Sequence, residues 1–393
     1  MDQIKNKKEN IKNFNNYKYS AKNKKNPSLF NKNKKEIIKK KENSPKFKKN
    51  NIQVINISPN KKVILPGSIY INKIPNDKKI PDKNYIKNIK NNINENNIQI
   101  KNANNDNANN LNNNSNNQIN FKTPPYISYA MHDNPNTEYR KEMEDFHNFQ
   151  ILSLQNIVFT YFSIFDGHSG AEVPTFLRDY FHIYLIKELK TINITNDSES
   201  NHQKIISSIN NSFHKIDKDI IDNQNFNNQN GSTGTIILLY RDPNNPYQRI
   251  IICANVGDSK GYIINKNKIK KITKDHICSD DNEVKRIKNN GGVVFNGRVF
   301  GMLMLTRSFG DKEFKECGVL ATPNIYSGLI EDDDLYVVIA SDGVWDTISQ
   351  DDLFKLSKEK MSSKEFSEKI VVSSLNRGTR DNISCFVIKL NSN

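Results

Sequence analysis

Several aspartate residues lie at the ends of apolar runs that are typical of β-strands. Asp166 follows such a run directly, Asp342 follows another after Ser341, and Asp381 lies two residues before a third. Buried strands bring their end residues to a common edge of a sheet, so we expect these carboxylates to lie close together. Clustered carboxylates raise one another's pKa unless a cation lies among them. Ligands that are all oxygen, with no cysteine, favour Mg²⁺ or Mn²⁺. The pattern therefore predicts a site for a hard metal ion.

Each of these features has an ordinary explanation when it is taken alone. An Asp-Gly pair such as Asp166-Gly167 is usually a turn. A single histidine such as His168 is usually structural or solvated. Arg140 and Glu144, four residues apart, would usually form a surface ion pair. The order of the features along the chain is more informative than any one of them.

A series of short motifs extends through residues 124–392 in a fixed order. The motifs are Arg140-Lys-Glu-Met-Glu-Asp145, Phe165-Asp-Gly-His-Ser-Gly170, Gly231-Ser-Thr-Gly-Thr235, Ala254-Asn-Val-Gly-Asp-Ser259, Asp275-His276, Glu283-x-x-Arg-Ile287, Gly291-Gly-Val293, Arg298-Val299, Gly301-x-Leu303, Thr306-Arg-Ser-Phe-Gly-Asp311, Thr322-Pro323, Ala340-Ser-Asp-Gly-Val-Trp-Asp346 and Arg377-Gly-Thr-Arg-Asp-Asn-Ile383. In this order the chain resembles the metal-dependent protein phosphatases of the PPM family, the type 2C serine/threonine phosphatases. Departures such as Ser169, where that family commonly has Gly, touch none of the expected ligands.

The resemblance implies a centre with two ions of Mg²⁺ or Mn²⁺. Asp166 would bridge the two metals, and the Gly167 carbonyl would bind one of them. Asp342 and Asp381 would bind the other. Asp275, together with Asp342, would form a weaker third site. The implied reaction is the hydrolysis of phosphoserine and phosphothreonine in proteins by a metal-activated water, with no covalent intermediate.

The resemblance also implies roles for residues around the metals. Glu144 and Asp145 would hold metal-bound waters. Arg140 would grip the substrate phosphate, which suits a planar guanidinium that donates two hydrogen bonds at once. His168 would be the general acid that protonates the departing Ser or Thr oxygen, a contribution of roughly 10²–10⁴-fold.

Alternating strand and helix patterns must position these residues. Short runs rich in β-branched and aromatic residues predict strands at 126–131, 158–165, 235–240, 250–255, 261–264, 335–340 and 383–390. Start signals predict helices at 171–190, from Asp197 or Ser198 to about 221, from Ser279 to Gly291, and after Ser349 and Ser363. We expect an α+β, four-layer α-β-β-α sandwich: two antiparallel sheets flanked by helices, with the metals in a cleft at one end. Residues 293–316 would form a flap beside the site.

Charge separates the first 120 residues from the rest of the 393-residue chain. Residues 1–120 hold 26 Lys, no Arg and 8 acidic residues, whereas 121–393 have a net charge of −3. Of the 30 residues at 91–120, 17 are Asn. Such a segment buries too little apolar surface to offset about 1–2 kcal/mol of backbone entropy per residue. We expect 1–120 to be a mostly disordered, low-complexity extension, within which 51–75 could dock as a strand, and 121–393 to be a PPM-type catalytic domain.

Several protein classes are disfavoured by the sequence. No apolar run approaches the roughly 18 residues needed to span a membrane. The N-terminus lacks the apolar core of a secretory signal. The four cysteines are widely spaced and form no C-x-x-C pair, so neither a disulfide scaffold nor a cysteine zinc site is expected. We expect a monomer in the cytoplasm or nucleus that acts on phosphoproteins, with no nucleic acid bound by the catalytic domain.

Two rival hypotheses remain open. The chain could be a scaffold whose lysine-rich extension binds polyanions, or a pseudophosphatase that binds phosphopeptides without turnover. Two acidic residues are also ambiguous: Asp258 is chiefly a turn residue with a lesser case for metal binding, and Asp346 could bind metal waters or serve a helix N-terminus. The physiological substrate, the regulation and the metal used in the cell have no readable signal.

Overall fold

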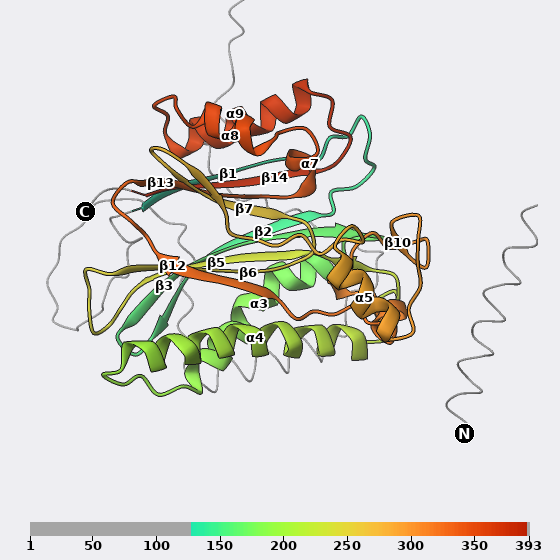
Figure 1. The fold of residues 1–393 in the computed structure, drawn as a ribbon, viewed down its shortest axis with the longest axis horizontal. Coiled ribbons are helices and arrows are strands. Elements are labelled where there is room, and N and C mark those ends of the chain that lie inside the picture. The colour runs from blue at the N-terminus through green and yellow to red at the C-terminus, as the bar shows by residue number, and fades with distance from the viewer. Residues whose placement is uncertain (1–126, 391–393) are drawn as a thin grey trace, which may run out of the picture. The chain divides into compact units, whose positions relative to one another are not determined.

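The computed structural model describes residues 127–390. Within them, two antiparallel sheets lie face to face (Figure 1). The first sheet has the strand order β1-β14-β13-β7-β8. Its strands are β1 (Ile127–Asn134), β7 (Lys260–Asn265), β8 (Ile269–Lys271), β13 (Asp334–Ala340) and β14 (Ile383–Leu390). The first and last described strands, β1 and β14, are therefore neighbours that close the domain.

The second sheet has the strand order β11-β4-β3-β5-β6-β12, and β2 also pairs with β3. Its strands are β2 (Asp145–Leu154), β3 (Ile157–His168), β4 (Gly231–Ser232), β5 (Gly234–Arg241), β6 (Arg249–Val256), β11 (Phe309–Gly310) and β12 (Asn324–Leu329). Strand β3 is central and is buried along most of its length. It ends at Asp166, Gly167 and His168, which places these residues at one end of the sandwich.

Burial on both faces explains why β3 is apolar at most positions up to Phe165. Phe162 and Ile164 pack into the layer between the sheets, together with Ile339 and Phe386 of the first sheet. The residues between them, such as Tyr161, point the other way and pack into a second core, between this sheet and the helices that cover it. Successive side chains of a strand point to opposite faces, so a strand covered on both faces reads as a continuous apolar run.

Helices cover both outer faces (Figure 1). Helices α3 (Glu172–Lys190) and α4 (Ser198–Asp222) pack on the second sheet. Helices α7 (Asp342–Trp345), α8 (Gln350–Leu356) and α9 (Ser363–Asn376) lie on the first sheet and enclose a third core. The predicted four-layer arrangement is confirmed.

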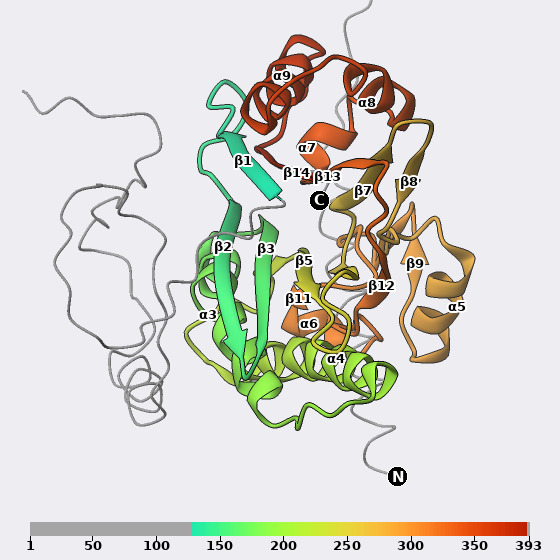
Figure 2. The same cartoon turned by 90° about the vertical axis from the view of Figure 1, so that its left-hand side faces the viewer.

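Within the flap, residues 293–316, the first part lies with α5 (Asp281–Asn289) to one side of the sheets, whereas the later part returns to the second sheet through β11 (Figure 2). The flap contains the hairpin β9 (Val294–Phe295) and β10 (Arg298–Val299), and the short helix α6 (Lys312–Lys315). It has a small core of its own, formed by Ile287, Val299, Leu303, Leu305, Phe314 and Val319.

The buried Glu283 of α5 holds the flap in place. Its carboxylate accepts hydrogen bonds at 2.6 Å from both Arg286 and Arg307. It also accepts one at 3.0 Å from the Thr306 hydroxyl. Burial raises the pKa of Glu283, but these arginine bonds outweigh burial and lower the pKa to about 2. An ion pair between Glu283 and Arg307 thus joins α5 to the flap.

The predicted elements match those of the structure, but several elements were not predicted. The ten-residue strand β2, the short strands β4, β8, β9, β10 and β11, and the four-residue helices α6 and α7 were not among the predictions. Strand β12 was not predicted, because its sequence mixes Gly, Ser and Asn with apolar residues and it is only partly buried. Strand β1 continues to Asn134, beyond the predicted end at 131. The cap of α9 is Ser362 rather than the predicted Ser363. Ser362 lies three residues before Glu365, and the two form a reciprocal capping box.

The remaining predictions concern the N-terminal extension, membrane-spanning helices and the cysteines. The expected extension at 1–120, its docking segment at 51–75 and the domain boundary near 120 lie outside the described residues. No helix among residues 127–390 is long and apolar enough to cross a membrane. None of the four cysteines forms a disulfide.

Candidate metal centre and active site

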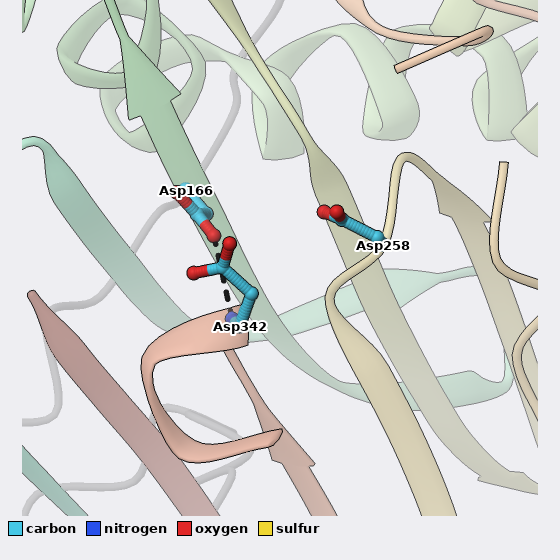
Figure 3. A group of neighbouring side chains, drawn as sticks. All are labelled: Asp166, Asp258 and Asp342. Atoms are coloured by element: carbon cyan, nitrogen blue, oxygen red, sulfur yellow. Dashed lines mark hydrogen bonds between the residues drawn. The ribbon is translucent and has the colours of Figure 1, made fainter. Parts of the chain in front are cut away.

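Three aspartates from different elements converge at the end of the sandwich. Asp166 lies near the end of β3, Asp258 lies in the turn between β6 and β7, and Asp342 begins α7. One carboxylate oxygen of each lies within 4.8 Å of the others. Figure 3 shows Asp166 and Asp342 facing each other, with the Asp342 amide donating to Asp166 at 3.4 Å. The two sheets thus each contribute part of one acidic centre.

The electrostatics of this centre are unfavourable without a cation. Burial raises the pKa of Asp166 well above its ordinary value, and the charges of Asp342 and Asp145 raise it further. Burial also raises the pKa of Asp342 well above its ordinary value, and the charges of Asp258 and Asp381 raise it further. The pKa of Asp258 is raised to about 6 by burial, although the Lys260 cation opposes the shift.

These residues fit the metals that the sequence predicts. The donors are all carboxylate oxygens, which suit Mg²⁺ or Mn²⁺. Negative groups held close together in a buried site are stabilised by a cation placed among them. The convergence of Asp166, Asp258 and Asp342 therefore gives the chemistry of the expected site without any further ligand type.

Gly167 occupies a position where no larger residue fits. A Cβ there would lie 2.4 Å from Pro174 Cγ and 2.7 Å from the Glu144 carbonyl oxygen. The Gly167 amide donates to the Glu144 carbonyl at 3.0 Å. The Glu144 carboxylate in turn accepts a 2.6 Å hydrogen bond from the Gly170 amide. Glu144 therefore braces the turn that presents Gly167 and His168.

Asp145 lies beside the centre on β2, directly opposite Asp166 in the strand register. It is buried, and burial raises its pKa to about 7. Its carboxylate accepts a 2.6 Å hydrogen bond from Ser341, the residue before Asp342. Asp145 therefore links the two sheets at the base of the centre.

Arg140 and Asp381 also border the site. Their side chains make an ion pair, and the Arg140 Nε donates to the Arg380 carbonyl at 3.3 Å. The Arg140 side chain remains 41% exposed, so it can still meet a ligand from solvent. The Asp381 carboxylate also accepts a 2.7 Å bond from the Asn382 amide.

His168 has a partner that the sequence analysis did not identify. Its Nε2 lies 2.9 and 3.0 Å from the two carboxylate oxygens of Asp311, which is almost fully buried. Burial lowers the pKa of His168, but the charge and hydrogen bond of Asp311 outweigh burial, so the pKa is raised. Asp311 belongs to the motif at 306–311. A histidine that is predicted to act as a general acid needs a carboxylate to orient it, and this need could have pointed to Asp311 in the sequence.

A buried ion pair supports the turn that carries Asp311. Asp217 of α4 accepts a 2.9 Å hydrogen bond from the Gly310 amide. Lys315 pairs with Asp217 at 2.9 Å and donates to the Ser308 carbonyl at 2.8 Å. The Ser308 hydroxyl in turn donates to Asp311. Helix α4 thus fixes the position of Asp311.

Asp275, Asp258 and Asp346 differ in their relation to the centre. Asp275 pairs with Lys271 at 2.6 Å and is not among the three converging carboxylates, so its predicted partnership with Asp342 stays a prediction. Asp258 instead stands beside Asp342, because the turn after β6 directs it there. Asp346 lies one turn after Asp342, and its charge adds to the raised pKa of Asp342 and Asp258.

A cleft of about 340 Å³ opens onto the centre. One wall is polar and the other is formed by the flap. The polar wall includes Arg140, Asp166, Gly167, His168, Asp258, Asp311, Asp342 and Asp381. The flap wall includes Arg298, Met302, Leu303, Met304, Leu305 and Phe314. Clustered carboxylates, a partly exposed arginine and an oriented imidazole thus line one solvent-accessible space, which suits the hydrolysis of an anionic ester.

Comparisons with known proteins are consistent with this geometry. A family model described as protein phosphatase 2C matches residues 129–383. Protein phosphatase 2C homolog 1 of Saccharomyces cerevisiae is 30% identical over 281 residues, which cover 68% of this chain and 96% of that protein. Probable protein phosphatase 2C 69 of Arabidopsis thaliana is 31% identical over 254 residues, covering 64% of this chain and 67% of that protein.

Solved structures show a similar fold. The serine-threonine phosphatase 2C from Toxoplasma gondii superposes with a TM-score of 0.58 at 18% identity, covering 69% of this chain and 96% of that one. A sex determining protein of C. elegans superposes with a TM-score of 0.55 at 22% identity, covering 69% of this chain and 66% of that one.

Proposed function

Because the chain belongs to the protein phosphatase 2C family and is a protein phosphatase, we propose that it hydrolyses phosphoserine and phosphothreonine with a water activated by bound Mg²⁺ or Mn²⁺. The observation that carries the mechanism is the convergence of Asp166, Asp258 and Asp342 at the cleft. The oriented His168 lines the same cleft. Water is the nucleophile, so no covalent intermediate forms.

Metals would be held by Asp166, the Gly167 carbonyl, Asp342 and Asp381, with Asp258 beside Asp342. Two such ions, when bound, lower the pKa of a water and neutralise charge on the phosphoryl oxygens. Their identity as Mg²⁺ or Mn²⁺ and their number rest on the all-oxygen donor set and on the family resemblance.

Arg140 binds the phosphoryl group in this mechanism. Its guanidinium contacts the Asp381 carboxylate on one side and keeps further N–H groups for an anion. The ion pair fixes the orientation of the guanidinium group, so its N–H donors are already oriented when the phosphate binds.

His168 delivers the proton to the departing Ser or Thr oxygen. Its Nε2–H is donated to Asp311, which leaves Nδ1 as the ring nitrogen that can carry that proton. Asp311 stabilises the protonated ring. Because the Asp311 carboxylate is buried, water does not compete with His168 for its hydrogen bond. An alkoxide is a poor leaving group, so this proton matters most for protein substrates.

The test is hydrolysis of para-nitrophenyl phosphate by the full chain in Mn²⁺, in Mg²⁺ and in EDTA. We expect turnover in the metals only, and its loss in Asp166→Ala. The matched control is Asp351→Ala, which changes an exposed aspartate on α8. A folded protein that shows no turnover in either metal would contradict the proposal and favour the pseudophosphatase hypothesis.

A further inference from the structure

The flap wall of the cleft exposes apolar side chains beside the acidic centre. Met302 and Met304 are 41% and 43% exposed, and both line the cleft that Asp166 and His168 also line. Large exposed apolar side chains that border a reaction centre mark a surface that meets a ligand.

The flap core anchors the segment that carries these methionines. Leu303 and Leu305 lie between and after them and are buried in the flap core. Leu303 bridges to Val299, and Leu305 bridges to Ile277. The two leucines also reach the cleft, but they are nearly buried, whereas Met302 and Met304 keep about two fifths of their surface exposed beside it. The two methionines are thus carried by a fixed segment.

A cation lies next to this apolar pair. Arg298 lines the cleft and donates a 2.8 Å hydrogen bond to the Met302 carbonyl. Among residues 127–390, no carboxylate forms an ion pair with Arg298. The flap wall therefore combines apolar surface with a positive charge that has no carboxylate partner among the described residues, and it lines the same cleft as Arg140 and Asp166.

We propose that Met302 and Met304 form a subsite for an apolar side chain next to the phosphorylated Ser or Thr of a protein substrate. This rests on the proposed function, because the two methionines line the same cleft as Asp166, where the phosphoryl group would bind. A phosphopeptide segment brings both negative charge and an apolar side chain, which match Arg298 and the methionine pair. Flexible thioethers adapt to Leu, Ile, Val or Phe without a tightly shaped pocket.

The experiment compares two phosphothreonine peptides that differ only in having Leu or Ser on both sides of the phosphothreonine. The full chain in Mn²⁺ should show a kcat/KM about fivefold higher for the Leu peptide, the gain expected from partial burial of one aliphatic side chain. The double variant Met302→Gln, Met304→Gln keeps side-chain length but removes apolar surface, and should bring the ratio of the two peptides close to one. Leu329→Gln, an equally polar change at an exposed position of β12, should leave the ratio as it is.

Two results would overturn the subsite. One is an equal kcat/KM for both peptides in the unmodified chain. The other is a loss in the double variant that is as large on para-nitrophenyl phosphate as on the Leu peptide, since that points to a damaged centre. If no substrate turns over, the proposed mechanism fails, and the subsite is decided by binding. Fluorescence anisotropy with non-hydrolysable phosphonate versions should then show the Leu peptide binding about fivefold tighter, and equal affinities would refute it.

Discussion

Loss of Asp258 should have opposite effects on stability with and without metal. Asp258→Asn keeps the size of the side chain and removes one of the charges that repel Asp342. In the metal-free protein, loss of this repulsion should stabilise the fold. In Mn²⁺, loss of a negative charge beside the ion should reduce the stabilisation that the metal provides.

The magnitude follows from the pKa of Asp258. Burial raises it to about 6, against about 3.9 for an unfolded Asp. The folded state therefore binds more protons than the unfolded state between these values, and the carboxyl group costs stability as pH rises through that window. The cost is complete above about pH 6. A shift of roughly two units corresponds to up to about 3 kcal/mol, so the variant should gain up to that amount at pH 7.5 in EDTA and nothing at pH 4.

Urea unfolding is the assay, followed by the fluorescence of Trp345, the single tryptophan, which lies in the turn of helix after Asp342. Each protein is measured in EDTA and in millimolar Mn²⁺, with the exposed Asp351→Asn as the matched control. The reasoning is refuted if Asp258→Asn is less stable than the unmodified chain in EDTA. Equal stabilisation of both proteins by Mn²⁺ would show that Asp258 is not near a bound ion.

Three other changes have clear expected outcomes. Asp311→Asn suits the left-handed backbone at this position, where φ is 50°. It should slow hydrolysis of a phosphothreonine peptide about tenfold or more while para-nitrophenyl phosphate is little affected, because only the alkoxide needs the His168 proton. Since Asp311 raises the pKa of His168, the loss should grow with rising pH, and equal losses on both substrates would contradict this role. Glu283→Gln should cost about 2–3 kcal/mol in urea unfolding at pH 7, with the deficit shrinking as pH falls from about 4.5 to about 2, whereas the exposed Glu368→Gln should cost almost nothing. Gly167→Ala should cost about 2 kcal/mol and weaken Mn²⁺ binding in calorimetry, because its Cβ would overlap a proline ring, and unchanged binding would argue against a carbonyl ligand here.

The fold and the main carboxylates could be predicted because their signals are local. Asp166 and Asp342 follow continuous apolar runs, which indicate strands buried on both faces, and strand ends define a sheet edge. The buried strands dominate the folding energy, so their local pattern survives in the final structure.

Other features depend on contacts between distant segments, which no local pattern encodes. Asp258 in Gly257-Asp258-Ser259 has the sequence of an ordinary turn, and only the packing of the two sheets brings it to Asp342. Asp311 meets His168 across 143 residues of chain, by way of a turn that α4 holds. The cap of α9 is different, because the Ser362–Glu365 spacing was present in the sequence and would have selected Ser362 over its neighbour.

The division of the acidic centre between the sheets has a mechanical consequence. Asp166 belongs to one layer and Asp342 follows a strand of the other, so an ion bound by both acts as a clamp across the layers. Any sliding of one sheet over the other would change the distance between the two carboxylates. Metal affinity is therefore coupled to the packing of the shared core, around residues such as Ile164 and Ile339, and by reciprocity metal binding must resist that sliding. Reshaping that distant apolar layer should thus tune the ion site without touching any ligand.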